Sequence, residues 1–318
     1  MSKTTRLAND HFGTALAYLM LGVAAGLALD ICAKWLLADY SLEQFVFLRS
    51  AFGVLFFLLA SRWYGGLGSL RTKRWKWHLL RTLFATGAMF GFFYGLNHMP
   101  LVNTLTIAFT APLIVTALSV PFLGEHVGWR RWVAVIAGFI GVVIVLRPGE
   151  GMFTPASVAV IGAAFCWAGL TLTARKLATT ETSFSLSIYI TAGPLLVSSF
   201  VLSGNYVAPT FNAWILFTVA GLCSALAWVG IVGGYRRAPP VVLAPFEYTA
   251  LIGAAIAGYM IWDEVPDKWV VAGGSIIIAS GIYIVYREVG NVMINRYIRT
   301  FTVSGAATLL RKLRDVRK

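Results

Sequence analysis

Three charged side chains that could bind a substrate lie inside long apolar runs of the sequence. Arg49 falls in the run Phe45–Trp63, Glu247 in Val241–Trp262, and Asp30 in Thr14–Leu37. A charge in the hydrocarbon region of a membrane costs several kcal/mol unless it is paired or hydrated, which makes each residue a functional candidate. A guanidinium can hold a substrate carboxylate through two parallel hydrogen bonds. A carboxylate can meet a substrate ammonium or carry a coupling proton.

Each of these residues also has a structural interpretation. Arg49 could pair with Asp30 or Glu247 and lock helices together, and Glu247 could bond to a neighbouring helix. Asp30 and Lys34 are four residues apart, so they share a helix face, and a local ion pair between them is favoured. The sequence leaves both interpretations open, but we expect Arg49 and Glu247 to be the charged substrate contacts.

Aromatic and amide side chains extend the candidate site. Trp167 and Trp228 lie well inside their apolar runs, and Tyr248 follows Glu247 directly. Such rings could wall a cavity for a substrate with an apolar or cationic part, although packing and lipid contact are commoner roles. Asn97 lies at the turn before Pro100 and is a further polar candidate.

The composition indicates a membrane protein. Of the 318 residues, 58% are hydrophobic and 12% are charged, with a mean hydropathy of +0.76, whereas soluble domains carry roughly 25% charged residues. Three cysteines within apolar runs predict neither a disulfide framework nor a metal site. The sequence has no nucleophile elbow and no phosphate-binding loop, so we predict neither an enzyme nor a cofactor.

The basic residues predict the orientation in the membrane. Nearly all Lys and Arg outside the apolar runs fall at the N-terminus, in alternate loops and in the tail, with Arg81 counted at the edge of one such loop. By the positive-inside rule both termini are cytoplasmic and the net charge of +13 needs no nucleic acid. The predicted fold is an all-α polytopic membrane protein of ten transmembrane helices. The runs are Thr14–Leu37, Phe45–Trp63, His78–Leu96, Leu101–Leu123, Arg131–Leu146, Pro155–Thr173, Phe184–Leu202, Trp214–Tyr235, Val241–Trp262 and Trp269–Tyr286.

An internal duplication relates the two halves. A shift of 139 residues places Pro100 on Pro239, Thr110 on Thr249 and Glu125 on Glu264. We therefore expect a five-helix repeat at 14–147 and a second at 155–287. Since five spans is an odd number, the second repeat is inverted, and such proteins place the substrate site near the midplane between the repeats.

The duplicated stretches resemble the EamA-type repeats of the drug/metabolite transporter superfamily. The resemblance rests on Tyr94–Pro100, Thr110–Pro112 and Leu123–Glu125, and the second copy departs from it with Leu251 and Asp263. It covers nearly the whole chain and implies ten helices and a transporter of small metabolites, often an amino-acid exporter. The stretch Ala244–Thr249 is similar to a branch that includes S-adenosylmethionine uptake carriers.

The sequence thus predicts a secondary-active or facilitative carrier of the bacterial inner membrane. Its best single substrate class is a small zwitterionic metabolite, an amino acid that is exported or exchanged. One alternative is uptake of a larger metabolite such as S-adenosylmethionine or riboflavin, and another is a membrane scaffold that works through the basic tail at 288–318. That tail either lies on anionic lipid as an amphipathic helix or is a solvated basic segment, and the carrier is a monomer or a homodimer.

Overall fold

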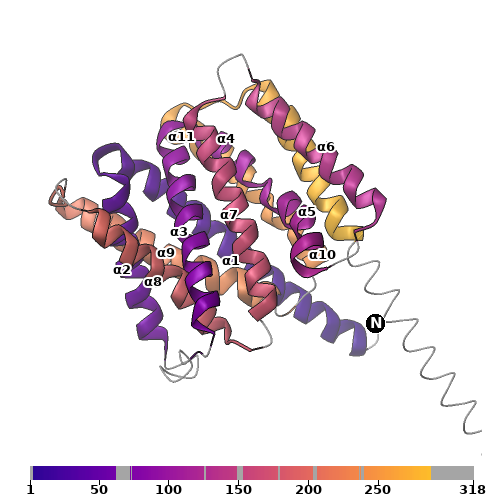
Figure 1. Ribbon diagram of the computed structural model, residues 1–318, viewed down its shortest axis with the longest axis horizontal. Helices are drawn as coiled ribbons and strands as arrows, with labels where there is room; N and C mark the ends of the chain where they lie inside the picture. The colour runs from indigo at the N-terminus through magenta and orange to yellow at the C-terminus, as the bar shows by residue number, and fades with distance from the viewer. Residues whose placement is uncertain are drawn as a thin grey trace, which may run out of the picture.

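The computed structural model describes residues 3–61, 72, 74–124, 127–148, 153–177, 180–202, 206–235, 237 and 240–287. Glu125 and the basic tail lie outside these residues, so the structure does not bear on the expectations for them. Every regular element in the described part of the chain is a helix (Figure 1). The bounds are α1 (Lys3–Asp39), α2 (Leu42–Ala60), α3 (Trp75–His98), α4 (Leu101–Ala108), α5 (Ala111–Leu123), α6 (Trp129–Leu146), α7 (Pro155–Leu177), α8 (Ser183–Val201), α9 (Phe211–Tyr235), α10 (Pro240–Glu247), α11 (Thr249–Trp262) and a last helix, Lys268–Arg287.

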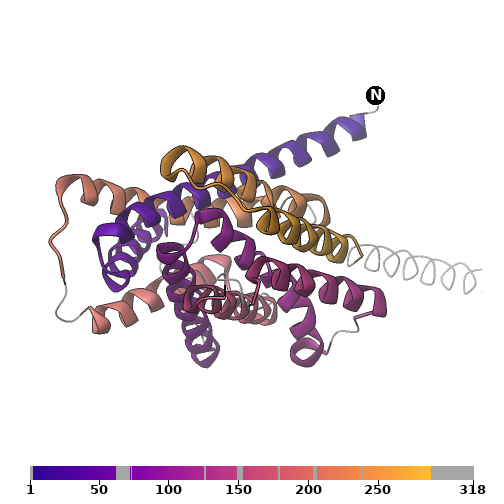
Figure 2. The ribbon, with the colours of Figure 1, turned by 90° about the horizontal axis from the view of Figure 1, so that it is seen from above.

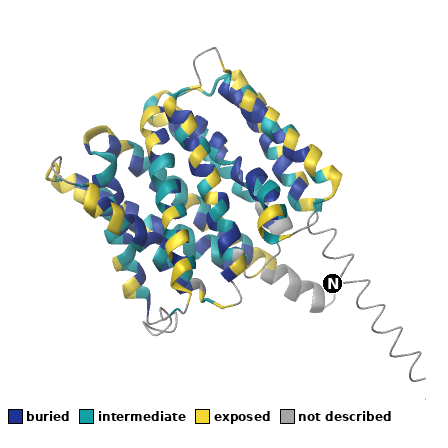
Figure 3. Cartoon of the chain, in the orientation of Figure 1, coloured by how far each residue is buried: buried dark blue, intermediate teal, exposed yellow. Residues whose placement is uncertain are grey.

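Nine helical segments among the described residues are long and apolar enough to cross a membrane. Large apolar side chains remain exposed on the bundle, and Leu59, Leu83, Ile136, Phe200 and Met260 are examples. Exposed residues are yellow in Figure 3 and occur along the helices as well as at their ends. Apolar surface on this scale is expected where lipid replaces water. The chain is a polytopic helical membrane protein, which confirms the predicted fold class.

Two of the predicted spans are interrupted helices. The run Leu101–Leu123 divides into α4 and α5 at Phe109 and Thr110, and the run Val241–Trp262 divides into α10 and α11 at Tyr248. Pro112 in the first turn of α5 has no amide hydrogen, so it removes one backbone hydrogen bond of a continuous helix and favours the interruption. The second interruption forms without a proline at the matching position.

The two interruptions touch each other. Phe109 and Tyr248 are 139 residues apart, the same shift that relates the duplicated stretches, and their ring centroids are 5.0 Å apart. The structure therefore brings equivalent points of the two duplicated stretches into contact inside the protein. The sequence analysis drew both runs as continuous helices and did not predict these interruptions.

Helices from the two halves of the chain pack side by side. α1 packs along α9, α3 along α7 and α2 against α8 (Figures 1 and 2). α6 and the last helix approach most closely at two glycines: a Cβ on Gly141 would lie 2.8 Å from the Gly273 carbonyl oxygen, and one on Gly273 would lie 2.5 Å from the Gly141 oxygen. Small residues allow such close helix contact in membranes.

The second duplicated stretch has Asp263 where the first has Gly124, and the backbone conformation explains why this difference is tolerated. Gly124 ends α5 with φ 67°, and Asp263 ends α11 with φ 54°, so both residues adopt the left-handed conformation. Aspartate is one of the few residues other than glycine that visits this region routinely, because its short side chain can bond locally. The helix ending is thus preserved where the glycine is not.

Candidate functional site

Arg49 is the centre of a buried polar group. The side chain is 6% exposed; Nη2 donates to Ser224 Oγ of α9 at 2.7 Å, and Nη1 lies 2.8 Å from Met89 Sδ of α3. The guanidinium also lies 5.5 Å from the centre of the Phe93 ring, while no described residue accepts a hydrogen bond from its Nε. Arg49 therefore joins α2, α3 and α9, and all of its direct contacts are neutral.

Asp30 of α1 supplies the nearby negative charge. The Asp30 carboxylate and the Arg49 guanidinium interact electrostatically without a direct ion pair, and Asp30 keeps some accessible surface. An opposite charge nearby lowers the cost of burying either group. Of the two partners considered for Arg49, the structure thus selects Asp30. The arrangement leaves both groups with unused hydrogen-bonding capacity, which a zwitterionic ligand could satisfy.

The expected ion pair between Asp30 and Lys34 is wrong. Lys34 instead pairs with Glu264, and its Nζ also donates to the Met99 carbonyl at 3.3 Å. The Trp262 ring adds a cation–π contact at 5.0 Å. The physical reason is that Glu264, just after α11, places its carboxylate against Lys34, while the charge near Asp30 is that of Arg49.

Glu247 lies in a different polar group from Arg49. It ends α10 beside the interruption, where its carboxylate faces the Tyr235 hydroxyl and interacts electrostatically with Tyr248. Tyr248 is buried, and its hydroxyl reaches Gly281, where a Cβ would lie only 1.9 Å away. No described contact joins Glu247 to Arg49, so the structure does not bring the two expected charged contacts together.

Trp167 and Trp228 stack on one another. Their ring centroids are 5.9 Å apart at an interplanar angle of 21°. Trp228 lies one helical turn after Ser224 on α9, so it neighbours the Arg49 group, and Trp167 of α7 remains 45% exposed. Asn97, by contrast, is exposed at the end of α3, and no described contact joins it to Arg49.

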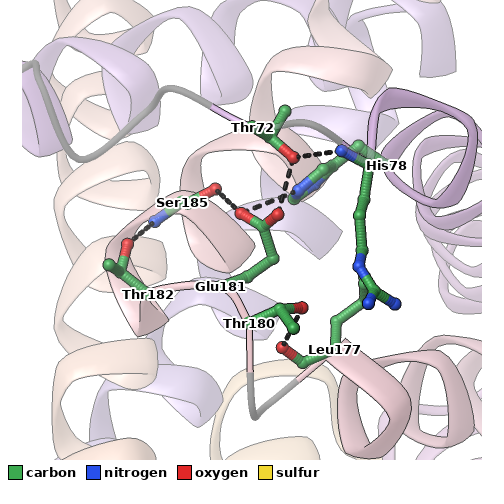
Figure 4. Close-up of polar contacts among 8 residues, drawn as sticks. Thr72, His78, Leu177, Thr180, Glu181, Thr182 and Ser185 are labelled. Atoms are coloured by element: carbon green, nitrogen blue, oxygen red, sulfur yellow. Dashed lines mark hydrogen bonds and ion pairs between the residues drawn. The ribbon is translucent and has the colours of Figure 1, made fainter.

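The sequence analysis missed a buried cluster at the opposite end of α3. His78, 3% exposed, lies 3.4 Å from Glu181 in the segment between α7 and α8. Thr72 and Ser185 donate to the Glu181 carboxylate at 2.6 and 3.3 Å (Figure 4). These residues stand near run ends and carry no periodic signal, so only their three-dimensional arrangement reveals that the carboxylate ties α3 to α8.

The cluster predicts a dependence of stability on pH. Partial burial raises the pKa of Glu181, but the hydrogen bonds from Thr72 and Ser185 and the adjacent His78 outweigh it and lower the pKa below its ordinary value of 4.5. A depressed carboxyl pKa stabilises the fold above the unfolded pKa, and that stability is lost as pH falls through the folded value. Thermal unfolding in detergent should show wild type losing about 1 kcal/mol relative to Glu181→Gln between pH 6 and pH 3. Parallel pH curves for the two proteins would contradict this.

These features define a class. A polytopic helical protein with two interrupted helices in contact, and charged and aromatic groups buried among its helices, is built as secondary transporters are. The EamA-like transporter family matches residues 13–147. The chain is 30% identical to the S-adenosylmethionine uptake transporter of Rickettsia bellii, over 87% of this chain and 95% of that protein. It belongs to the EamA-like transporter family, and it is a transporter, not an enzyme.

Other relatives are named for different substrates. The chain is 31% identical to a riboflavin transporter of Vibrio cholerae, over 84% of this chain and 92% of that one. It is 26% identical to the pseudopaline exporter CntI of Pseudomonas aeruginosa, over 75% and 84%. A crystal structure with 18% sequence identity covers 87% of this chain and 97% of its own with a TM-score of 0.61, which supports the fold alone.

Proposed function

We propose that this protein takes up a nucleoside-bearing zwitterion of the S-adenosylmethionine type across the bacterial inner membrane. The relatives named for S-adenosylmethionine uptake support this alternative over amino-acid export, the first expectation from the sequence. Their family consists of transporters, which also removes the reason for a scaffold that acts through the tail.

The observation that carries the proposal is the interaction of Asp30 with buried Arg49, whose partner Ser224 lies one helical turn from the stacked Trp228. S-adenosylmethionine presents an ammonium, a carboxylate, a sulfonium and a flat base. Asp30 offers the negative charge for a cationic group. The Trp228 ring, one turn from Ser224, offers a π face for the base or the sulfonium. The site therefore holds partners for the cationic groups and for the base of the ligand.

Riboflavin is the second candidate substrate. It is a flat heteroaromatic molecule without an ammonium or a carboxylate, and relatives carry its name. The stack of Trp167 on Trp228 suits its ring system equally well. Riboflavin transport would need the tryptophans but not the charge on Asp30, so one substitution separates the two candidates.

The architecture proposed for transport is an inverted repeat. The repeats at 14–147 and 155–287 would cross the membrane in opposite senses with both termini in the cytoplasm, and they would rock about the contact of Phe109 with Tyr248. The sequence contains no nucleotide-binding loop, so an ion or substrate gradient drives the cycle. Glu247, facing Tyr235, is the candidate carrier of a coupling proton.

Counterflow in proteoliposomes tests the proposal. Vesicles with wild-type protein, preloaded with unlabelled S-adenosylmethionine, should accumulate the labelled compound. Asp30→Asn should reduce the rate at least about tenfold, since it removes a charge-assisted contact. The matched control, Asp39→Asn, changes an exposed residue at the end of the same helix and should leave the rate unchanged.

The other outcomes identify the substrate. Riboflavin counterflow that survives Asp30→Asn would favour the second candidate. Flux of amino acids alone would restore the first expectation. Absence of flux with all three substrate classes, in protein shown to be folded, would overturn the proposal.

A further inference from the structure

Arg81 is a second buried cation, and no counter-ion faces it in the part of the chain that the structure describes. It is 3% exposed in α3, where Nη1 donates to the Leu170 carbonyl at 2.8 Å and to Thr173 Oγ1 at 3.3 Å, both on α7. Its Nε has no partner. Among the described side chains no carboxylate faces Arg81, and its contacts are all neutral. The sequence analysis had assigned this residue to the basic loop.

The absence of a facing carboxylate distinguishes Arg81 from Arg49. Arg49 interacts electrostatically with Asp30, while among the described residues Arg81 contacts a carbonyl and a hydroxyl. A buried charge without a partner costs several kcal/mol, and its cost falls when an anion binds. Arg81 therefore gains more than Arg49 does from the anionic group of a ligand.

Arg81 is also aligned with the candidate substrate site. Met89, which contacts Arg49, and Ala85 and Arg81 recur at intervals of four residues and so lie on one face of α3. Eight residues of helix span about 12 Å. Between the two cations Ala85, Leu170 and Ile190 form a cluster, and Trp228 packs against it.

We propose that Arg81 binds the carboxylate of the transported metabolite. The ligand would lie along α3 with its carboxylate at Arg81 and with its sulfonium and base extending past Trp228 toward Asp30. This inference rests on the proposed function and adds to it the position of the anionic end. It also explains why the site would suit an elongated metabolite, since the cluster that includes Trp228 separates Arg81 from Asp30 and Arg49.

The test compares two ligands on the full-length protein. Binding of S-adenosylmethionine is measured against its decarboxylated counterpart, and wild type should prefer the carboxylate form by roughly tenfold to a hundredfold. Arg81→Gln should abolish this preference. If Arg81 had only a structural role, its substitution would weaken the binding of both ligands equally. The ratio of the two affinities therefore separates an effect on carboxylate binding from an effect on folding. Lys76→Gln, at an exposed cation near the start of the same helix, should keep the wild-type ratio.

Two further variants make the outcome decisive. Arg81→Met removes the buried charge and places no new polar group in the interior, so it provides a folded variant even if Arg81→Gln fails to fold. It should also lose the preference for the ligand that carries the carboxylate. A wild-type preference in either variant, or its loss in Arg49→Gln instead, would overturn the inference. If wild type binds neither ligand, the proposed function fails and this inference fails with it.

Discussion

Replacing Arg49 with glutamine should reduce counterflow of S-adenosylmethionine by about a hundredfold. The substitution removes the charge that balances Asp30 and weakens the links from α2 to Ser224 and Met89. Charge-assisted hydrogen bonds contribute about 1.5–3 kcal/mol each, and each 1.36 kcal/mol changes a rate tenfold. Initial rates of counterflow give the effect, and Arg130→Gln, at an exposed arginine, is the control.

A double substitution shows whether Asp30 and Arg49 act as a pair. Removing one partner leaves the other buried and uncompensated, which costs about 3–5 kcal/mol in typical cases. Asp30→Asn combined with Arg49→Gln should therefore unfold at a higher temperature than either single variant, although it will not transport. Additive losses of thermal stability would show that the two groups are independent.

The architecture could be predicted because it depends on averages over long segments. Apolar runs of membrane-spanning length are visible in any sequence, and the nine candidate membrane spans begin and end within a few residues of the predicted runs. The interruptions at Phe109 and Tyr248 were invisible for the opposite reason. Both lie inside runs whose average hydropathy is that of a membrane span, and hydropathy does not report where a backbone changes direction.

The sequence indicated which residues belong to the candidate site but not which of them contact one another. Arg49, Asp30, Trp167 and Trp228 were singled out because charges and large rings deep in apolar runs are rare, and the structure gathers them around α9. Which carboxylate faces which cation depends on how helices distant in sequence are packed. Lys34 pairs with Glu264, which is 230 residues away, and not with Asp30, which is four residues away. Periodicity within one helix cannot predict this pairing.

The contact of Lys34 with Glu264 forms a latch at the end of the bundle where α1 ends. One carboxylate serves three helices: Glu264, which follows α11, pairs with Lys34 of α1 and accepts from the backbone N–H of Leu101, the first residue of α4, at 2.9 Å. A carboxylate at a helix N-terminus is stabilised by the helix dipole as well as by the hydrogen bond. In the proposed alternating-access cycle this contact would break whenever that end opens, so we expect the latch to set the population of the closed state.

Glu264→Gln should therefore open this end of the protein. Loss of charge-assisted contacts worth about 1.5–3 kcal/mol shifts a two-state equilibrium by roughly tenfold to a hundredfold. The population of the open state is measured at Val102, which is 7% exposed and directly follows Leu101. Val102→Cys, in a protein from which Cys32, Cys166 and Cys223 have been removed, is labelled with a membrane-impermeant maleimide.

The expected labelling rate rises at least about tenfold in Glu264→Gln, because the reagent reaches the cysteine only while the latch is open. Lys34→Met should produce the same increase. The double variant should add little to it, since both changes break one contact, and Asp39→Asn at the same end should have no effect. Equal labelling in all of these proteins would show that the contact of Lys34 with Glu264 holds the helices together without controlling their opening.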